Sequence, residues 1–368
     1  MITKKNINLL MISSSSSLGG GTKNMFELGE DLNNQFCVYY AIPKNNNFLN
    51  FLNEHNHLEI SERKLNIQDI LNLKKFINVN AIDIIHAHGK GAGSIARIIK
   101  LFTRKPLIYT FHGIHLKCHK WYKRYLYIFY EYLFGWLDSA KVLVSKSEKK
   151  YAKESKISLG NQSKIINNGV TNKPIKQCNK DYRFENLNFD SNKIIVTSIC
   201  RFVEQKNIKD ILKIAENLPY IDFSIIGDGQ LMVEIKELIL KKKLKNICLH
   251  GEKKNIFKYL YSSDIYLTTS LYEGLPISVL EAMSIGLPII ASNVIGNCDT
   301  VENGKSGYLY EISNIEEGAF YVDKLAKDIS LRKKIGYAAW QRQRALFSKE
   351  KMISNYLSLY KCVLGHKY

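Results

Sequence analysis

SLYEGLPISVLEAMSIGLPIIAS, residues 270–292, is the stretch of sequence that decides the fold. Glu273 and Gly274 follow a predicted strand, and Pro276 suits the first turn of the helix predicted after it. Gly286 closes that helix before a second apolar strand begins. The unsatisfied amides at the start of the helix form a positive N-terminus that is suited to bind a phosphate. A strand, a turn, a helix and a further strand indicate an α/β protein with parallel strands.

Short apolar runs extend this architecture along the chain, most of them separated by stretches long enough for a helix. Continuous Val, Ile and Leu runs that alternate with helices are typical of a mostly parallel sheet covered on both faces. The predicted strands lie at residues 7–13, 82–88, 106–111, 141–145, 193–199, 222–227, 264–270 and 287–292. Residues 174–192 are polar and Asn-rich, so we predict that they connect two such domains, with substrates held in a cleft between them.

Composition narrows the class of protein. A chain of 368 residues suits two domains of roughly 150–200 residues better than one. With 45% hydrophobic and 24% charged residues it is globular, and its net charge of +19 attracts phosphates, nucleic acid or an anionic membrane. Seven dispersed cysteines without a C-x-x-C pair favour a reducing compartment. No segment reaches the roughly 18 apolar residues of a spanning helix, so we expect a soluble or peripheral protein.

Two motifs follow predicted strands in the first half of the chain. LGGGTKN, residues 18–24, precedes a helical pattern, and its glycines permit either close approach to an anion or only a tight turn. TFHG, residues 110–113, ends another strand, where His112 has either a functional or a structural role. His86 and His88 offer only part of a metal site, so a structural role is favoured for them.

Residues 121–136, WYKRYLYIFYEYLFGW, form an aromatic helical pattern that follows Lys117, His119 and Lys120. Aromatic rings beside basic side chains are typical of a helix that lies at a membrane interface. A core helix with a few exposed rings accounts for the pattern about as well, and a nucleic-acid platform accounts for it less well. The sequence leaves the choice between membrane contact and core open.

The second half of the chain offers both cations and carboxylates. In CRFVEQKN, Arg201 and Lys206 flank the turn into a helix and can converge on a diphosphate, although surface cations are often only solvated. Glu273 precedes the predicted helix whose N-terminus is suited to bind a phosphate, and Glu281 lies within that helix. One carboxylate can bind sugar hydroxyls and the other a ribose, and the alternative for Glu281 is an ordinary exposed position.

These motifs, in this order, resemble the retaining glycosyltransferases of family 4, which have the two-domain GT-B fold. The resemblance covers nearly the whole chain, and its most specific part is the E-x7-E pair of Glu273 and Glu281. The other matching motifs are LGGGTKN, TFHG, NNGV at 167–170, the Arg201 and Lys206 pair, IIGDGQL at 225–231 and ENGKSGYLY at 302–310.

The resemblance implies two Rossmann-like, doubly wound parallel-sheet domains that face each other across a cleft. Residues 1–175 would form the acceptor-binding domain, and residues 190–346 the domain that binds the nucleotide-sugar. Residues 347–368 would form a helix that crosses back to the first domain.

The resemblance also implies a role for each matching residue. Arg201 and Lys206 would hold the nucleotide diphosphate, and Glu281 the ribose. Glu273 would bind the transferred sugar, with His112 across the cleft near that sugar and the acceptor. The implied catalytic residues are His112, Glu273, Arg201 and Lys206. The implied donor-binding residues are Gly20, Gly21, Arg201, Lys206, Gly227, Asp228, Glu273, Gly274, Leu275, Pro276, Ile277, Ser278 and Glu281.

Two positions depart from the family pattern. Cys200 stands before Arg201 where the family has glycine, which puts the local backbone geometry in question. Gly296 and Asn297 stand where the family commonly has two glycines, so the contacts with the donor on that side are uncertain.

The activity implied is transfer of a sugar, with retention, from a nucleotide-sugar donor to a lipid-linked saccharide in cell-surface polysaccharide, O-antigen or capsule synthesis. A UDP-sugar is the favoured donor. Arg201, Lys206 and the helix N-terminus would stabilise the leaving diphosphate, so no metal and no cofactor are expected. The basic charge and the aromatic segment add an anionic membrane as a partner, without nucleic acid. The expected location is cytoplasmic, peripheral to the inner face of the plasma membrane.

Two rival functions remain. A nucleotide-sugar 2-epimerase shares the fold and the nucleotide, but it needs an acid and base pair that this sequence does not identify. A non-catalytic polyanion binder accounts for the charge of +19 and would bind with a steep salt dependence.

Overall fold

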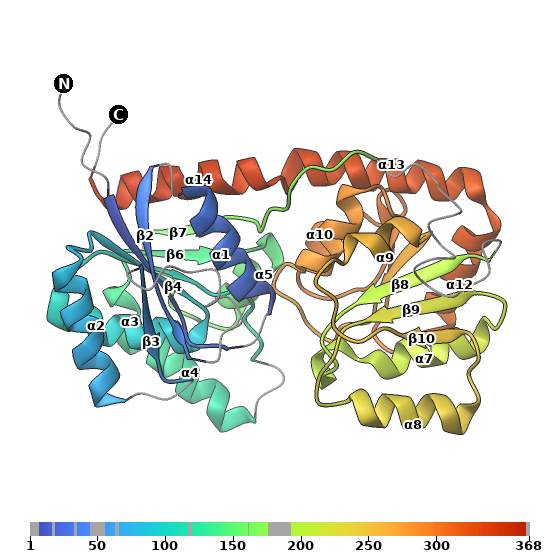
Figure 1. Cartoon of the computed structure of the whole chain (residues 1–368), viewed down its shortest axis with the longest axis horizontal. Helices are drawn as coiled ribbons and strands as arrows, with labels where there is room; N and C mark the ends of the chain where they lie inside the picture. Colours follow the sequence, from blue (N-terminus) through green and yellow to red (C-terminus); the bar gives the residue numbers. More distant parts are fainter. Residues whose placement is uncertain are drawn as a thin grey trace. The chain divides into compact units, whose positions relative to one another are not determined.

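The computed structural model divides the chain into two compact units, each with its own parallel sheet (Figure 1). The first unit comprises Met1–Asn168 and Glu350–Tyr368, and the second comprises Gly169–Lys349. The structure describes residues 7–16, 19–32, 35–44, 56–62, 66–116, 120–160, 162–175 and 193–365. The connection predicted at residues 174–192 lies outside the described residues, apart from its first two positions.

The described part of the first unit forms a parallel sheet of seven strands. They are β1 (Ile7–Ser13), β2 (Phe36–Pro43), β3 (His57–Ile60), β4 (Ile84–His88), β5 (Leu107–Thr110), β6 (Ala140–Leu143) and β7 (Ser163–Ile165). Their order in the sheet is β3-β2-β1-β4-β5-β6-β7, so the winding reverses between β1 and β4. In open α/β sheets such a reversal creates a crevice at the carboxyl ends of the strands.

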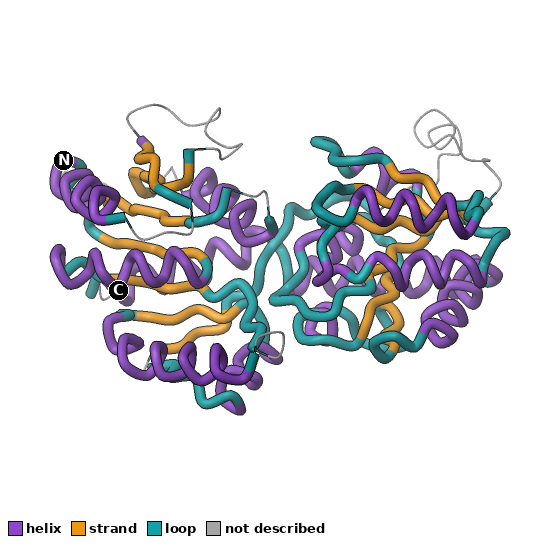
Figure 2. Tube along the Cα trace, turned by 90° about the horizontal axis from the view of Figure 1, so that it is seen from below, coloured by secondary structure: helices purple, strands orange, loops and turns teal. Residues whose placement is uncertain are grey.

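Two helix layers cover the first sheet, because successive strand side chains point to opposite faces. Leu9 and Met11 face α1 (Gly20–Leu32) and α14 (Lys349–Val363), the last helix of the chain. Leu10 and Ile12 face the opposite layer, which contains α2 (Ile67–Val79) and α3 (Lys90–Thr103). Figure 2 shows helices on both sides of the strands in each unit. The buried strands are therefore mostly apolar on both faces, as is typical of a doubly covered sheet, although β4 also buries His86 and His88.

The second unit repeats the architecture with six described parallel strands. They are β8 (Ile195–Ile199), β9 (Asp222–Ile226), β10 (Ile247–Leu249), β11 (Ile265–Thr268), β12 (Ile289–Ser292) and β13 (Gly307–Tyr310). The order is β10-β9-β8-β11-β12-β13, with the reversal between β8 and β11. The helices are η4 (Glu204–Lys206), α7 (Ile208–Asn217), α8 (Met232–Lys242), α9 (Phe257–Ser262), α10 (Ile277–Ser284), α11 (Asn297–Thr300), α12 (Ile315–Lys327) and α13 (Ile329–Leu346).

All eight apolar runs in the sequence form strands, namely β1, β4, β5, β6, β8, β9, β11 and β12. The strands that the sequence missed are mostly sheet edges: β3, β7, β10 and β13 each contain three or four residues and lie at an end of a sheet. An edge strand is paired on one side and partly exposed, so it carries no continuous apolar run. The missed strand β2 is rich in aromatic residues rather than in Val, Ile and Leu.

The aromatic segment forms α4 (Trp121–Phe134), followed by η3 (Gly135–Leu137). Of the two alternatives, the core helix is wrong, because five of the large rings face solvent with exposed fractions of 61–74%, while Tyr127 is buried. Their spacing places them on one side of the helix, a surface that we name the aromatic stripe. The aromatic stripe consists of Trp121, Tyr125, Phe129, Tyr132 and Trp136. Lys117 and His119, which precede it, lie outside the described residues.

Buried charges fix the opposite side of α4 to the unit. The Arg97 guanidinium donates to Glu131 at 2.8 Å and to Asp138 at 2.6 Å, and all three side chains are almost fully buried. The Lys141 ammonium lies 3.5 Å from the same Asp138 carboxylate. Burial lowers the pKa of Lys141, and the neighbouring carboxylates oppose that effect. Since removing one member leaves unpaired charges in an apolar surrounding, the cluster determines where α4 packs.

We predict that Arg97→Met lowers the free energy of unfolding by about 3–5 kcal/mol, because it leaves two buried carboxylates with only Lys141 to balance their charge. The midpoint of urea unfolding measures the loss. Lys150→Met is the matched control, since Lys150 and Glu154 form an exposed pair at 3.8 Å, and its midpoint should stay unchanged. Equal midpoints for both variants would contradict the anchoring role of the cluster.

Candidate functional site

A lysine and a glutamate from neighbouring strand ends pair in the second unit. Lys206 ends η4 after β8, and Glu273 follows β11, which lies beside β8 at the reversal. Lys206 Nζ lies 2.5 Å from Glu273 Oε1, with side chains only 15% and 7% exposed. Ser270 Oγ donates to the same carboxylate oxygen at 2.6 Å. The structure therefore brings together one cation and one carboxylate that the sequence predicted for the site.

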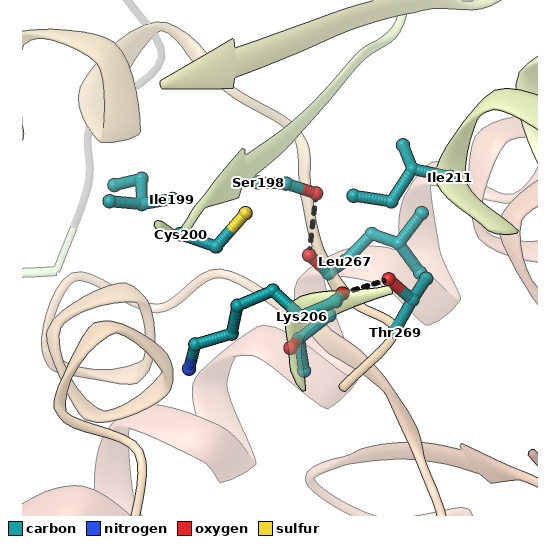
Figure 3. A pocket seen from close by; sticks show the side chains of 8 residues that line it. Ser198, Ile199, Cys200, Lys206, Ile211, Leu267 and Thr269 are labelled. Atoms are coloured by element: carbon teal, nitrogen blue, oxygen red, sulfur yellow. Dashed lines mark hydrogen bonds between the residues drawn. The ribbon is translucent and has the colours of Figure 1, made fainter. Parts of the chain in front are cut away.

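The backbone of the Lys206 turn is fixed from β11. Thr269 Oγ1 donates to the carbonyl oxygens of Lys206 and Asn207, both at 2.9 Å. Figure 3 shows Lys206 at a small hollow between β8 and β11, with its ammonium extending away from the carbonyl that Thr269 binds. On the wall of the hollow, Ser198 Oγ donates to the carbonyl oxygen of Leu267 at 2.7 Å. These bonds hold the ammonium at the carboxyl edge of the sheet.

The N-terminus of α10 lies in the same segment as Glu273. Pro276 is its N-cap residue, and no described side chain caps it. Its amides therefore keep the partial positive charge that favours an anion. Glu281, in the middle of α10, is only 6% exposed, so the alternative of an ordinary exposed glutamate is wrong. The predicted donor residues Gly274, Leu275, Pro276, Ile277 and Ser278 form the turn and the first residues of this helix.

Two glycines allow close backbone contacts around these residues. Gly296 has φ +86°, and a Cβ there would lie 2.5 Å from the carbonyl oxygen of Gly274. Gly227 has φ +137°, and a Cβ there would lie 1.8 Å from the carbonyl oxygen of Cys200. Both positions thus require glycine, for conformation and for space. Cys200, which departs from the family pattern, provides the carbonyl oxygen in the second of these contacts. Burial raises the pKa of its thiol to about 12.

Arg201 and Asp228 lie on neighbouring turns of the second unit. Phe202, between β8 and η4, donates its amide to the carbonyl oxygen of Asp228 at 2.8 Å. The Arg201 side chain is exposed, and among the described residues it has no hydrogen-bond or ion-pair partner. The two predicted cations thus differ, because Lys206 is paired with Glu273 whereas Arg201 has no such partner among the described residues.

His112 adopts a strained backbone at the carboxyl end of β5. Its φ is +58°, a left-handed conformation that is uncommon for residues other than glycine and concentrates at functional sites. Its ring lies against Gly21 at the start of α1, where a Cβ would approach the ring to 3.1 Å. The buried carboxylate of Glu148 accepts the amides of Gly113 and Val144, each at 2.7 Å. These contacts hold the turn. The other predicted glycine, Gly20, is the first residue of α1.

Comparison with known proteins identifies the family. Residues 31–172 match the family described as Glycosyltransferase Family 4, and residues 179–342 match glycosyl transferases group 1. An Escherichia coli protein named UDP-Gal:alpha-D-GlcNAc-diphosphoundecaprenol alpha-1,3-galactosyltransferase is 31% identical over 273 residues, which cover 68% of each chain. The chain belongs to glycosyltransferase family 4.

Further relatives agree with this assignment. The capsular polysaccharide biosynthesis glycosyltransferase CapM of Staphylococcus aureus is 23% identical over 76% of this chain and 77% of its own. The structure of Anabaena HepE with UDP and glucose superimposes with a TM-score of 0.85 at 17% identity, covering 97% of this chain and all of HepE. Sucrose-phosphate synthase from Thermosynechococcus elongatus gives a TM-score of 0.83 at 17% identity, covering 98% of this chain and all of that one. These likenesses confirm the GT-B fold of the glycosyltransferase.

Sequence reasoning missed two residues that support the site of this glycosyltransferase. Ser270 binds Glu273 from three positions earlier, and Glu148 holds the turn after His112. A signal for Glu148 was present, because Ser145 and Glu148 have the S-x-x-E spacing of a capping box, and Ser145 Oγ accepts the Glu148 amide. The glutamate side chain then reaches the turn after β5, which only the tertiary structure reveals.

Three histidines of the first unit are neutral because they are buried. Burial lowers the pKa of His112 from 6.5 to about 4. It also lowers the pKa of His86 and of His88 well below 6.5, with a smaller contribution from the neighbouring rings. Within the described ranges, no group of three or more His, Cys, Asp or Glu side chains is arranged to hold a metal ion. The rings bind one another instead, with His88 Nδ1 2.8 Å from His112 Nε2.

We predict that the glycosyltransferase loses stability as the pH falls from about 6.5 to about 4, because the unfolded chain then binds protons that the native rings do not. The melting temperature against pH measures the fall, which should be shallower in His112→Gln. In the native protein, the ring signals of His112 should not titrate between about pH 8 and about pH 5. Titration of that ring near its ordinary pKa would contradict the burial argument.

Proposed function

We propose that this glycosyltransferase transfers a sugar from a UDP-sugar to a saccharide carried on a lipid diphosphate, with retention of configuration and without a metal, in cell-surface polysaccharide synthesis. The observation that carries the proposal is the largely buried side chain of Lys206, whose ammonium binds Glu273 in the segment that leads into the uncapped N-terminus of α10. A cation and helix amides together suit a diphosphate. The name of the Escherichia coli relative, with its UDP-Gal donor and diphosphoundecaprenol acceptor, supports both substrate classes.

Leaving-group stabilisation is the main contribution that we infer for the second unit. When the bond from the anomeric carbon to the diphosphate oxygen breaks, its electron pair stays on the diphosphate. Negative charge therefore grows where Arg201, Lys206 and the amides of α10 can stabilise it. Lys206 has three N–H donors, so it can bind Glu273 and a phosphate oxygen at the same time.

The configuration at the anomeric carbon is retained if the acceptor hydroxyl attacks the same face of the sugar from which the diphosphate departs. The new bond joins the acceptor oxygen to the anomeric carbon, and the acceptor proton passes to the departing phosphate. We assign Glu273 to the sugar hydroxyls rather than to a covalent bond, because its carboxylate already accepts from Lys206 and Ser270. Glu281 is assigned to the ribose and His112 to the transferred sugar and the acceptor.

We predict that UDP binds the full-length protein with at least about tenfold higher affinity than GDP in buffer with a metal chelator, as measured by calorimetric titration. Lys206→Met, Arg201→Ala and Glu281→Ala should each weaken UDP binding by about tenfold or more, because each removes a charged partner. Lys209→Met is the matched control, since Lys209 pairs with Glu234 on the surface, and it should bind like the wild type.

Several outcomes would contradict this donor site. They are equal affinity for UDP and GDP, binding that requires a divalent metal, or binding that survives all three substitutions. Conversion of a UDP-sugar to its epimer without an acceptor would identify the epimerase instead. Steeply salt-dependent binding of nucleic acid without nucleotide binding would identify the polyanion binder.

The aromatic stripe of α4 supports a lipid-linked acceptor. Bulky rings exposed to this extent are costly in water but favourable at the headgroup level of a membrane. Lys120 and Lys123 are exposed at the start of the same helix, and Arg124 lies beside them. We infer that α4 docks this protein on an anionic membrane, where the acceptor is located. Among the described residues, no helix is long and apolar enough to cross a membrane.

We predict that the protein sediments with vesicles of anionic phospholipid at about 0.1 M salt and is released by Lys120→Gln, Lys123→Gln and Arg124→Gln together. A second variant, Trp121→Ser with Trp136→Ser, should also be released, while both keep UDP binding. The control replaces the exposed Lys236, Lys241 and Lys245 by Gln, which removes the same charge elsewhere. Equal release by the control would show that only net charge matters.

A further inference from the structure

A continuous chain of hydrogen bonds leads from the last helix of the protein to His112. Tyr360 of α14 lies 2.7 Å from His86 Nδ1 through its hydroxyl oxygen. His86 Nδ1 lies 3.2 Å from His88 Nε2, and His88 Nδ1 lies 2.8 Å from His112 Nε2. On its other side, His86 Nε2 lies 2.8 Å from Thr110 Oγ1. Every member belongs to the first unit, so the chain lies within one rigid core.

The fold explains why these side chains meet. His86 and His88 are two apart on β4, so both point to the sheet face that α14 covers. Thr110 is paired with His88 on the neighbouring strand β5. Tyr360 follows Tyr356 by four residues on α14, so both phenols face the same surface. All five side chains are at least 96% buried, and water does not compete for their hydrogen bonds.

The hydroxyl of Tyr360 gives the chain a direction. A buried phenol has to donate its proton or lose a hydrogen bond. Among the described residues its hydrogen-bond partner is His86 Nδ1, so that nitrogen accepts and carries no proton. Because His86 is neutral, its proton is on Nε2, where it is donated to Thr110 Oγ1.

The same reasoning shows which ring nitrogens of His88 and His112 carry the proton. His88 Nε2 faces His86 Nδ1, and two lone pairs at 3.2 Å would repel, so His88 Nε2 carries the proton. It shares the one lone pair of His86 Nδ1 with the closer Tyr360 hydroxyl at 2.7 Å. The Nδ1 of neutral His88 is then an acceptor, and it accepts the Nε2 proton of His112. The Nδ1 of His112 is left as a lone pair. It is buried and has no hydrogen-bond partner among the described residues.

We propose that Tyr360, His86 and His88 are positioning residues that hold His112 in the tautomer with its proton on Nε2. His112 Nδ1 is then always ready to accept a hydrogen bond from a hydroxyl of the sugar substrate. An imidazole with the opposite tautomer would present an N–H instead, which donates to a hydroxyl oxygen and cannot accept the hydroxyl proton. The assignment rests on the proposed role of His112 toward the sugar and the acceptor. Glu148 holds the backbone of the turn after His112, and the chain of hydrogen bonds through His86 and His88 keeps the ring proton of His112 on Nε2.

The test measures the tautomer directly in the full-length protein labelled with ¹⁵N-histidine. In the wild type, His112 should give a pyridine-like Nδ1 signal and a pyrrole-like Nε2 signal. In Tyr360→Phe the donor that sets the direction is lost, so His112 should show both tautomers. In a transfer assay kcat should fall by about tenfold, while the KM for the UDP-sugar changes by less than about twofold. Tyr310→Phe is the control, since it removes a buried phenol hydroxyl that has no hydrogen-bond partner among the described residues and lies in the second unit, so it should leave the tautomer unchanged.

The outcomes separate this inference from the proposed function. A pyridine-like Nε2 on His112 in the wild type overturns the inference, as does an equal effect of Tyr360→Phe and Tyr310→Phe on the tautomer and on kcat. The wild-type spectrum decides the point even if Tyr360→Phe does not fold. Absence of UDP binding or of transfer overturns the proposed function, while the NMR signals still report whether the chain sets the tautomer.

Discussion

The reversal of strand order beside the first strand of each sheet is the constraint on which both sites depend. Where neighbouring parallel strands send their connections in opposite directions, the loops after them separate and leave their polar groups accessible. In the second unit this edge carries Lys206 after β8 and Glu273 after β11. In the first unit it carries His88 at the end of β4, and His112 follows on the next strand. One topological rule therefore positions two chemically different sets of side chains.

Backbone conformations that are costly elsewhere fix the functional groups at these edges. His112 has a left-handed conformation that is stabilised because Glu148 accepts the amide of the next residue. Gly296 has a positive φ as well, and it packs directly on the turn that contains Glu273. Strain of this kind persists only where the surrounding structure over-determines it. The apolar layers packed on both faces of each sheet supply that determination.

Features that depend on a local sequence pattern, such as the central strands, could be predicted. Contacts between residues far apart in the chain could not. Continuous apolar runs identified the central strands, whereas the edge strands β3, β7, β10 and β13 carry no such run. Lys206 and Glu273 were each expected at the donor site, but no spacing rule showed that they form an ion pair with each other. The helical period of residues 121–136 was readable, but only the packing of Glu131 against Arg97 determined which side faces solvent. Likewise, no pattern within β4 indicated that its histidines lie under a helix from the far end of the chain.

The placement of α14 has a consequence for how the protein is made. Met352, Tyr356, Leu359 and Tyr360 complete one apolar layer of a sheet whose first strand begins at Ile7. During synthesis, the part of that face that α14 covers stays exposed while the second unit is translated, and α1 alone packs on the rest of it. Apolar surface that is exposed in this way is prone to non-native association until α14 packs. A ribosome that stops before α14 releases a product with an open core, which quality control can distinguish from the finished enzyme.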